Sequence, residues 1–285
     1  MAFETIPLHP LFGAEIRGLD LSSALDDATF GRILDAFNEY SLLLFRGQPL
    51  DDVAQVAFSQ GFGPLETTVK ANPAGGSAFA RQSNLDMATG EIIAPSDRRM
   101  VYQRGNLMWH SDSSFKAVPS LCSILSAREV PPTGGETDFA SARAAYAELP
   151  ADMKRRIEGL VAGHSYIYSR GLVDPNLLTE EEKAEVPPVE QAVVRTNPVN
   201  GRKSLFVGAH ASHIVGWPVE EGRALLKQLT EFATRPRFCH RHEWRAHDVL
   251  VWDNRCCLHR ARPYDDLRHR RLMQRTTVAG DGPTV

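Results

Sequence analysis

The chain has 285 residues, of which 42% are hydrophobic and 24% are charged. A chain of this length can bury a substantial core without disulfides or a structural metal. Its 32 basic and 35 acidic residues give a net charge of -3, which argues against a protein that coats nucleic acid. A normal hydrophobic content with a small net charge also argues against disorder. These values are typical of an ordinary soluble globular protein.

The cysteines and the N-terminal segment bear on the cellular compartment. The chain has four cysteines, with no CxxC spacing: Cys122, Cys239, Cys256 and Cys257. Scattered cysteines in a chain of this length predict reduced thiols. The stretch MAFETIPLHPLFGAEIRG contains acidic Glu4 and lacks the apolar segment of a secretory signal. Apolar runs such as 42–45 are far shorter than the roughly 20 residues that span a membrane. We therefore expect a cytoplasmic protein without a membrane or nucleic-acid partner.

Helical periodicity is confined to a few segments. Residues 26–40 have apolar side chains at helical spacing, and residues 51–61 begin with acidic residues and end at glycine. Residues 141–149 and 150–160 predict a pair of helices separated by proline. Residues 218–234 give the clearest pattern, with proline at the start and one apolar face. We expect these helices to flank another kind of core.

Most of the remaining chain predicts short strands. These runs are 41–46, 120–128, 136–140, 191–196, 203–207, 238–244, 249–252 and 271–278. Turns at 197–201 and 245–248 predict two hairpins. Many short strands without regular strand–helix alternation predict a jelly roll or a barrel. Residues 66–108 show little periodicity, and we expect them to form a loop or lid at the active site.

The sequence lacks several common catalytic motifs, but it contains one pattern suited to a metal. It has no dinucleotide or phosphate-binding glycine motif, no GxSxG and no HExxH. In the stretch WHSD, His110 and Asp112 would point to the same face of an extended strand. Two histidines and one carboxylate form the ligand set of non-haem Fe(II) oxygenases. The alternative is a histidine that is merely hydrogen-bonded to a nearby acid.

A second block near the C-terminus could complete such a site. The stretch WDNRCCLHR places His259 where a later strand can bring it beside the first pair. Further on, Arg271 and Arg275 are four residues apart, so on a strand they would line one wall. A pair of guanidinium groups near a metal suits the binding of two carboxylates.

These blocks carry a resemblance to a known family. The stretches PLHPLF, LLLFRGQPL, FGPLE, WHSDSSF, VPPTGGETDFA, GRKSLFVGAHASH, VWDNRCCLHRARPYD and RRLMQRTT follow one another in order. Over nearly its whole length the chain resembles the Fe(II)- and 2-oxoglutarate-dependent dioxygenases of the taurine and 2,4-dichlorophenoxyacetate dioxygenase family. MWHSDSSF and GAHASH are most similar to the phenoxyacetate branch.

The resemblance implies roles for matching residues. His110, Asp112 and His259 would bind Fe(II), and Thr137 with Arg271 would hold the distal carboxylate of 2-oxoglutarate. The keto-acid end of this co-substrate would chelate the iron. O2 would be the third reactant.

The resemblance also implies a substrate pocket. Arg275 would meet the acidic group of the substrate, and Asn106 and Lys70 match pocket positions of the branch. His210 and His213 either face the pocket or are packed and hydrogen-bonded. A histidine thought to face the substrate in the branch is replaced here, where Asn197 follows Arg195 and Thr196.

The fold implied is mainly β with flanking helices: a double-stranded β-helix, or jelly-roll, core in a single domain over residues 1–285. The reaction implied is hydroxylation of a small acid, first of all an aryloxyacetate such as 2,4-dichlorophenoxyacetate, coupled to conversion of 2-oxoglutarate into succinate and CO2. The product would collapse to a phenol and glyoxylate, a step in aromatic compound degradation. Alternatives are a sulfonate, an alkyl sulfate or an aryloxypropionate as substrate, or a non-catalytic 2-oxoglutarate-binding sensor. We also expect a homo-oligomer.

Overall fold

The core of the protein is a seven-stranded sheet, seen in a computed structural model that describes residues 3–72 and 75–285. In the order in which they lie side by side, its strands are β1 (Glu4–Pro7), β2 (Ala14–Arg17), β3 (Leu42–Phe45), β13 (Val249–Asp253), β5 (Cys122–Glu129), β15 (Leu272–Val278) and β4 (Phe79–Ser83). Every pairing is antiparallel except that of β2 with β3. The central strands β3 and β13 are fully buried, which fits their apolar sequences, and β5 is buried over its first six residues.

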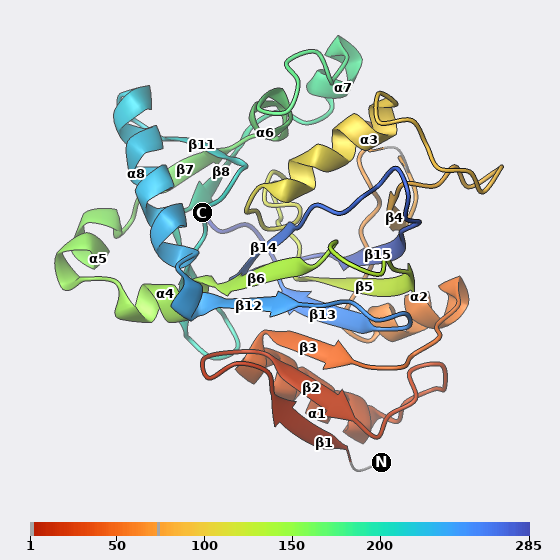
Figure 1. Cartoon of the computed structure of the whole chain (residues 1–285). Helices are drawn as coiled ribbons and strands as arrows, with labels where there is room; N and C mark the ends of the chain where they lie inside the picture. The colour runs from red at the N-terminus through yellow and green to blue at the C-terminus, as the bar shows by residue number, and fades with distance from the viewer. Residues whose placement is uncertain (1–2, 73–74) are drawn as a thin grey trace.

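A smaller antiparallel sheet faces the main sheet (Figure 1). Its strands are β12 (Cys239–His242), β6 (Thr137–Ser141) and β14 (Cys257–Ala261). Phe139 of β6 packs in one buried cluster with Leu125, Leu250 and Met273 of the main sheet. Two facing antiparallel sheets with a shared apolar interior form the jelly-roll core that the sequence predicts.

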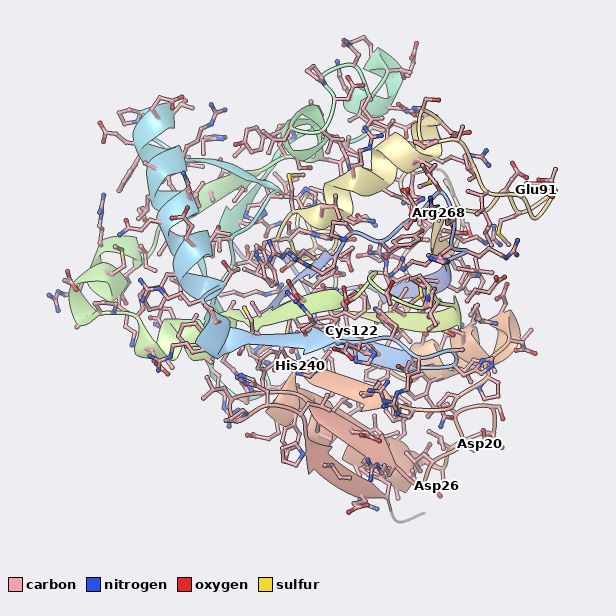
Figure 2. All side chains as sticks on the ribbon, viewed as in Figure 1. Asp20, Asp26, Glu91, Cys122, His240 and Arg268 are labelled. Atoms are coloured by element: carbon pink, nitrogen blue, oxygen red, sulfur yellow. The ribbon has the colours of Figure 1, made fainter. Side chains whose placement is uncertain are left out.

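Two helices cover the other face of the main sheet. These are α1 (Asp27–Tyr40) and α2 (Asp52–Gln60). Asp26 caps α1 by accepting a hydrogen bond from the Thr29 N–H at 2.7 Å, and it lies at the edge of the molecule in Figure 2. Phe37 and Phe58 from these helices pack against the outer side of the sheet. The predicted helices at 26–40 and 51–61 are confirmed.

A third group of elements packs against the end of the small sheet. It contains a sheet of β11 (Ala211–Ile214), β7 (Val161–His164) and β8 (Val189–Ala192), and a hairpin of β9 (Val194–Thr196) and β10 (Lys203–Leu205). Its helices are α4 (Ala142–Glu148), α5 (Ala151–Ile157) and α8 (Val219–Ala233). The apolar faces of α4 and α8 share one buried cluster with these strands. The predicted helices at 141–149, 150–160 and 218–234 are therefore present.

Shorter helices complete the described chain: α3 (Arg98–Gln103), η1 (Arg104–Leu107), α6 (Tyr166–Gly171), α7 (Glu180–Ala184) and η2 (Pro236–Phe238). None of the helices within residues 3–72 and 75–285 has the length and apolar character needed to cross a membrane.

Two expectations about the connections need correction. The turn at 197–201 does join a hairpin, β9 and β10, but the turn at 245–248 does not. It leads from β12 in the small sheet to β13 in the main sheet, because these strands pair with different partners. Residues 66–108 are also more ordered than expected, since their described part contains α3, η1 and β4, which extends the main sheet by pairing with β15.

Candidate active site

Three potential metal ligands converge between the two sheets. Within the described chain, the ligand atoms of His110, Asp112 and His259 lie within 4.8 Å of one another, and all three residues are buried. Nε2 of His110 is 3.8 Å from one carboxylate oxygen of Asp112, and Nε2 of His259 is 3.5 Å from the other. The backbones of His110 and His259 also form an antiparallel bridge. This bridge brings residues far apart in sequence to one point.

The backbone around Asp112 differs from the extended strand that the sequence suggests. Only His110 belongs to a bridge, and the chain then turns, with Ser113 at a φ of 53°. The Asp112 N–H donates to Oδ1 of Asn254 at 3.2 Å, and its carbonyl accepts from the hydroxyl of Ser120 at 2.9 Å. The backbone of Asp112 is therefore paired by the side chains of Asn254 and Ser120 and not by a neighbouring strand. The carboxylate of Asp112 still lies beside the imidazole of His110.

Further hydrogen bonds orient the carboxylate of Asp112. The Ser123 hydroxyl donates to Oδ2 of Asp112 at 2.7 Å. Asn254 in turn donates to the hydroxyls of Ser123 and Ser120, at 3.0 Å each. Its Oδ1 also accepts from Nε1 of Trp252 at 3.0 Å. The carboxylate is thus fixed by a network that is anchored in β5 and in the loop after β13.

The electrostatics favour the ligand form of each residue. Burial lowers the pKa of His110 and of His259, so both imidazoles are neutral near pH 7. Burial opposes ionisation of Asp112, but the charge of Arg275 and the hydrogen bond from Ser123 favour it, and the pKa of Asp112 lies below its usual value. Met108 offers its carbonyl to Nδ1 of His110 at 2.8 Å, which leaves Nε2 as the basic nitrogen.

The donor set fits a divalent metal of the iron type. Both ring nitrogens of His259 are buried without a hydrogen-bond partner among the described residues. Burying them in this way costs free energy unless a bound metal or ligand provides a partner. Two neutral imidazole nitrogens and one carboxylate oxygen suit non-haem Fe(II).

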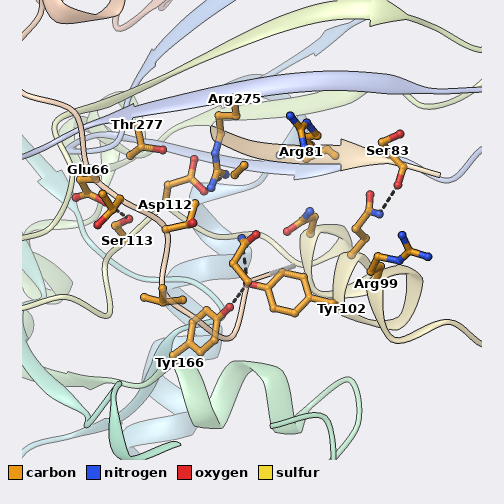
Figure 3. A pocket seen from close by; sticks show the side chains of 18 of the residues that line it. Glu66, Arg81, Ser83, Arg99, Tyr102, Asp112, Ser113, Tyr166, Arg275 and Thr277 are labelled. Atoms are coloured by element: carbon orange, nitrogen blue, oxygen red, sulfur yellow. Dashed lines mark hydrogen bonds and ion pairs between the residues drawn. The ribbon is translucent and has the colours of Figure 1, made fainter. Parts of the chain in front are cut away.

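A cavity of about 410 Å³ opens beside this cluster (Figure 3). Five of the predicted site residues line it: Asn106, His110, Asp112, His210 and Arg275. His210 is buried, stacks on Tyr166 and meets the ring of His110 edge-on. His210 therefore lies in the cavity lining, and its contact with a substrate stays a prediction.

The two arginines occupy different surroundings. Arg275 lines the cavity and forms an ion pair with Asp112. Arg271 is buried outside the cavity lining, next to the ring of Tyr264. The expectation that they line one wall is therefore wrong: Arg271 precedes β15, and the register with β5 shifts between Leu272 and Met273.

Arg271 nevertheless has free hydrogen-bonding capacity. Its Nε and Nη2 are buried with no partner among the described residues, and burial lowers its pKa. A side chain at Gly135 would touch Nε of Arg271 at 3.5 Å, so the GGET segment lies against the guanidinium. Thr137 follows two residues later, buried on β6, where its hydroxyl accepts from Nε1 of Trp244 at 3.0 Å.

Lys70, His213 and Asn197 also lie outside the cavity lining. The side chain of Lys70 is 79% exposed and pairs with Glu185 at 2.5 Å, so its expected place in the pocket is wrong. His213 packs over the backbone of Gly163 and bonds to Ser212, as in its packed reading. Asn197 lies in the β9–β10 turn, where its Oδ1 accepts from the N–H of residue 199, and it does not line the cavity.

Several cavity residues have no signal in the sequence. They include Phe115, Lys116, Tyr166 and Arg170. Tyr166 and Arg170 come from the short helix α6, whose pattern gives no link to the metal-binding motifs. The segment 66–108 supplies lining residues from Glu66 to Asn106, and its action as a lid stays a prediction.

Comparisons with known proteins agree with this geometry. Residues 4–277 match the family model described as taurine catabolism dioxygenase TauD, TfdA family. The alpha-ketoglutarate-dependent 2,4-dichlorophenoxyacetate dioxygenase of Cupriavidus pinatubonensis is 44% identical over 95% of this chain and 96% of its own. The (S)-phenoxypropionate/alpha-ketoglutarate-dioxygenase of Sphingobium herbicidovorans is 37% identical over 98% of this chain and 96% of its own.

A solved structure is similar over the whole length. The crystal structure of AAD-2 in complex with Mn(II) and N-oxalylglycine has a TM-score of 0.93 and 42% sequence identity, and the match covers 100% of this chain and 99% of that chain. The predicted jelly-roll fold and the resemblance seen in the sequence are both confirmed. The chain belongs to the TauD, TfdA family of dioxygenases.

Proposed function

We propose that the protein is an Fe(II)- and 2-oxoglutarate-dependent dioxygenase that hydroxylates a small carboxylic acid, with an aryloxyacetate as the first choice of substrate. The observation that carries this proposal is the buried set of His110, Asp112 and His259 beside a cavity of about 410 Å³. Relatives named for 2,4-dichlorophenoxyacetate and for (S)-phenoxypropionate support the class of acid.

His110, Asp112 and His259 would hold the iron. When bound, Fe(II) supplies the redox chemistry that couples O2 and 2-oxoglutarate to hydroxylation, which redox-silent zinc cannot supply. The role of the chain is to keep both imidazoles neutral and the carboxylate ionised, as the directions of their pKa shifts favour. The hydrogen bond from Ser123 keeps the carboxylate of Asp112 oriented.

Arg271 and Thr137 would hold the distal carboxylate of 2-oxoglutarate. The unpartnered Nε and Nη2 of Arg271 offer two parallel donors, which match a carboxylate. The absence of a side chain at Gly135 keeps the approach to Nε open.

Arg275 would bind the acid group of the primary substrate. Its guanidinium lies at the carboxylate of Asp112, next to the metal-binding cluster. In an aryloxyacetate the carbon to be hydroxylated adjoins the carboxylate, so anchoring the acid here brings that carbon toward the cluster. Hydroxylation at this carbon gives a hemiacetal, which collapses to a phenol and glyoxylate. Asn106 and His210 line the same cavity and offer further polar contacts.

We further propose that residues 66–108 act as a lid in a single-domain enzyme. They supply much of the cavity lining, from Glu66 to Asn106. A cover of this kind excludes water from the reacting centre.

Cytoplasmic location and homo-oligomerisation also belong to the proposal. The free cysteines, three of them buried, support a reducing compartment. Light scattering after gel filtration tests the oligomeric state.

The activity is tested by succinate formation from 2-oxoglutarate with Fe(II), O2 and a panel of acids. The panel contains aryloxyacetates, aryloxypropionates, sulfonates and alkyl sulfates. We expect aryloxyacetates to give succinate together with a phenol, and their methyl esters to give neither. Turnover of a sulfonate or alkyl sulfate instead would identify that alternative class. Absence of succinate with every acid would refute the proposed dioxygenase activity and favour a non-catalytic 2-oxoglutarate sensor.

A further inference from the structure

The positively charged residues that line the cavity differ in whether an acidic residue of the chain pairs with them. The cationic lining residues are Arg81, Arg99, Lys116, Arg170 and Arg275. Three of them bind acids: Arg99 pairs with Asp86 at 3.0 Å, Lys116 with Glu66 at 2.7 Å, and Arg275 with Asp112. Arg81 and Arg170 have no acidic partner within the described residues. Arg81 is exposed and solvated, whereas Arg170 is only 8% exposed. Arg170 is thus the buried cavity cation that lacks a counterion.

The guanidinium of Arg170 is held firmly in place. It lies over the ring of Tyr102 at 4.3 Å from the centroid, and 5.0 Å from that of Tyr166. Its Nη1 donates to the carbonyl oxygen of Tyr102 at 3.2 Å, and its Nε is buried without a partner among the described residues. It packs closely on Gly105, where an added Cβ would collide with its Nη1. The group is oriented before any ligand arrives.

Such a group has unused capacity for an anion. A buried charge without a counterion is costly, and contacts with two aromatic faces offset only part of that cost. A bound carboxylate would supply both the missing charge and a hydrogen-bond acceptor for the guanidinium. Because the guanidinium is already fixed, little conformational entropy is lost on binding.

The position of Arg170 relative to Arg275 indicates which end of a ligand it meets. Figure 3 shows Arg275 entering the pocket from one side and Tyr102 and Tyr166 on the opposite side, with Asp112 between them. Arg170 lies on these two tyrosine rings. A substrate whose acid group meets Arg275 would therefore direct its far end toward Arg170.

We propose that Arg170 binds a second anionic group at the far end of the primary substrate. The cavity then prefers elongated dianions, such as an aryloxyacetate with a carboxylate on the ring, over monoacids of the same shape. This inference rests on the proposed function for the position of the first acid group, at Arg275.

A matched pair of acids tests this preference. The dissociation constants of 4-carboxyphenoxyacetate and of its neutral isostere 4-carbamoylphenoxyacetate are measured by calorimetry, with Mn(II) and 2-oxoglutarate present so that binding occurs without turnover. We expect the wild type to bind the dianion roughly ten- to hundred-fold more tightly, as for a charge-assisted hydrogen bond. Equal affinities in the wild type would overturn the proposal, and this comparison needs no variant.

Three variants assign the preference to a residue. In Arg170→Met the affinity ratio should fall to about one, and Arg170→Lys should keep part of it because the charge remains. Arg81→Met removes a charge from the same cavity at an exposed position, so it should leave a ratio close to the wild-type value. A ratio that survives in Arg170→Met, or disappears in Arg81→Met, would overturn the assignment to Arg170.

Failure of this inference is distinct from failure of the proposed function. Succinate formation with unsubstituted phenoxyacetate reports on the proposed function and does not involve a second anion. The ratio of dissociation constants reports on Arg170 even if no acid is turned over.

Discussion

Asn254 links the proposed iron-binding carboxylate to the main sheet, and its replacement by alanine tests how far the site depends on that link. Its Oδ1 accepts from the N–H of Asp112 and from Nε1 of Trp252. Its Nδ2 donates to the hydroxyls of Ser120 and Ser123, and Ser123 donates to the carboxylate of Asp112. All these groups are buried.

The expected size of the effect follows from the bonds that are lost. Asn254→Ala leaves two buried donors, the Asp112 N–H and the Trp252 ring N–H, without an acceptor. At about 1–3 kcal/mol for each unsatisfied group, the free energy of unfolding should fall by roughly 2–6 kcal/mol. With the Ser123 hydroxyl no longer held, metal affinity should fall by about 10- to 100-fold, as is typical for partners of metal ligands.

Urea unfolding and calorimetric titration with Mn(II) measure the two effects separately. Ser123→Ala is the milder variant and should lower metal affinity with a smaller loss of stability. Ser126→Ala is the matched control, because this hydroxyl is buried on the same strand without a hydrogen-bond partner among the described residues. It should alter neither measurement. Wild-type metal affinity in folded Asn254→Ala and in Ser123→Ala would refute the reasoning.

Three further predictions concern single residues. Asp112→Ala removes the anionic ligand, so Mn(II) affinity and succinate formation should fall by orders of magnitude; retention of wild-type metal binding would contradict the assignment. Arg271→Ala should weaken 2-oxoglutarate roughly ten- to hundred-fold in a binding titration, with only partial rescue by lysine, which lacks the planar fork. An unchanged constant would place the carboxylate elsewhere. His164 is buried, and burial lowers its pKa to about 3 from an ordinary 6.5. Because the folded pKa is the lower one, the unfolded chain takes up the extra proton as pH falls below 6.5, and stability is lost. Between pH 7 and 5.5 the wild type should lose about 1 kcal/mol more than His164→Phe in urea unfolding, and equal losses would show that this histidine does not titrate on unfolding.

The amphipathic helices are the most predictable part of the fold. Their boundaries depend on local features, such as the capping Asp26 of α1 and the capping Asp51 of α2. Strand pairing depends on distant residues and is less predictable. The run at 245–248 has the composition of a hairpin turn, but the buried Asp248 bonds to Arg46 and His242 and helps to hold a crossover between sheets.

The candidate site likewise contains some residues that the sequence predicts and others that it does not. The HxD spacing and the later histidine are visible in the sequence because both pieces are short and chemically distinctive. The position of Lys70 is not visible in the sequence, because its partner Glu185 lies 115 residues away. Arg170 has no signal in the sequence for a similar reason, because its position at the cavity depends on the packing of α6 against Tyr102, which no local pattern encodes.

The packing of the two sheets determines whether the site forms at all. His259 belongs to the small sheet, whereas Ser123 and Arg275, which hold the carboxylate of Asp112, belong to the main sheet. The ring of His259 lies 4.8 Å from that of Trp252 in the main sheet. A core aromatic therefore packs directly against the imidazole, although it offers no ligand atom. It follows that a cavity created in this core should loosen the metal site as well as the fold, since buried side chains are close-packed and transmit such shifts.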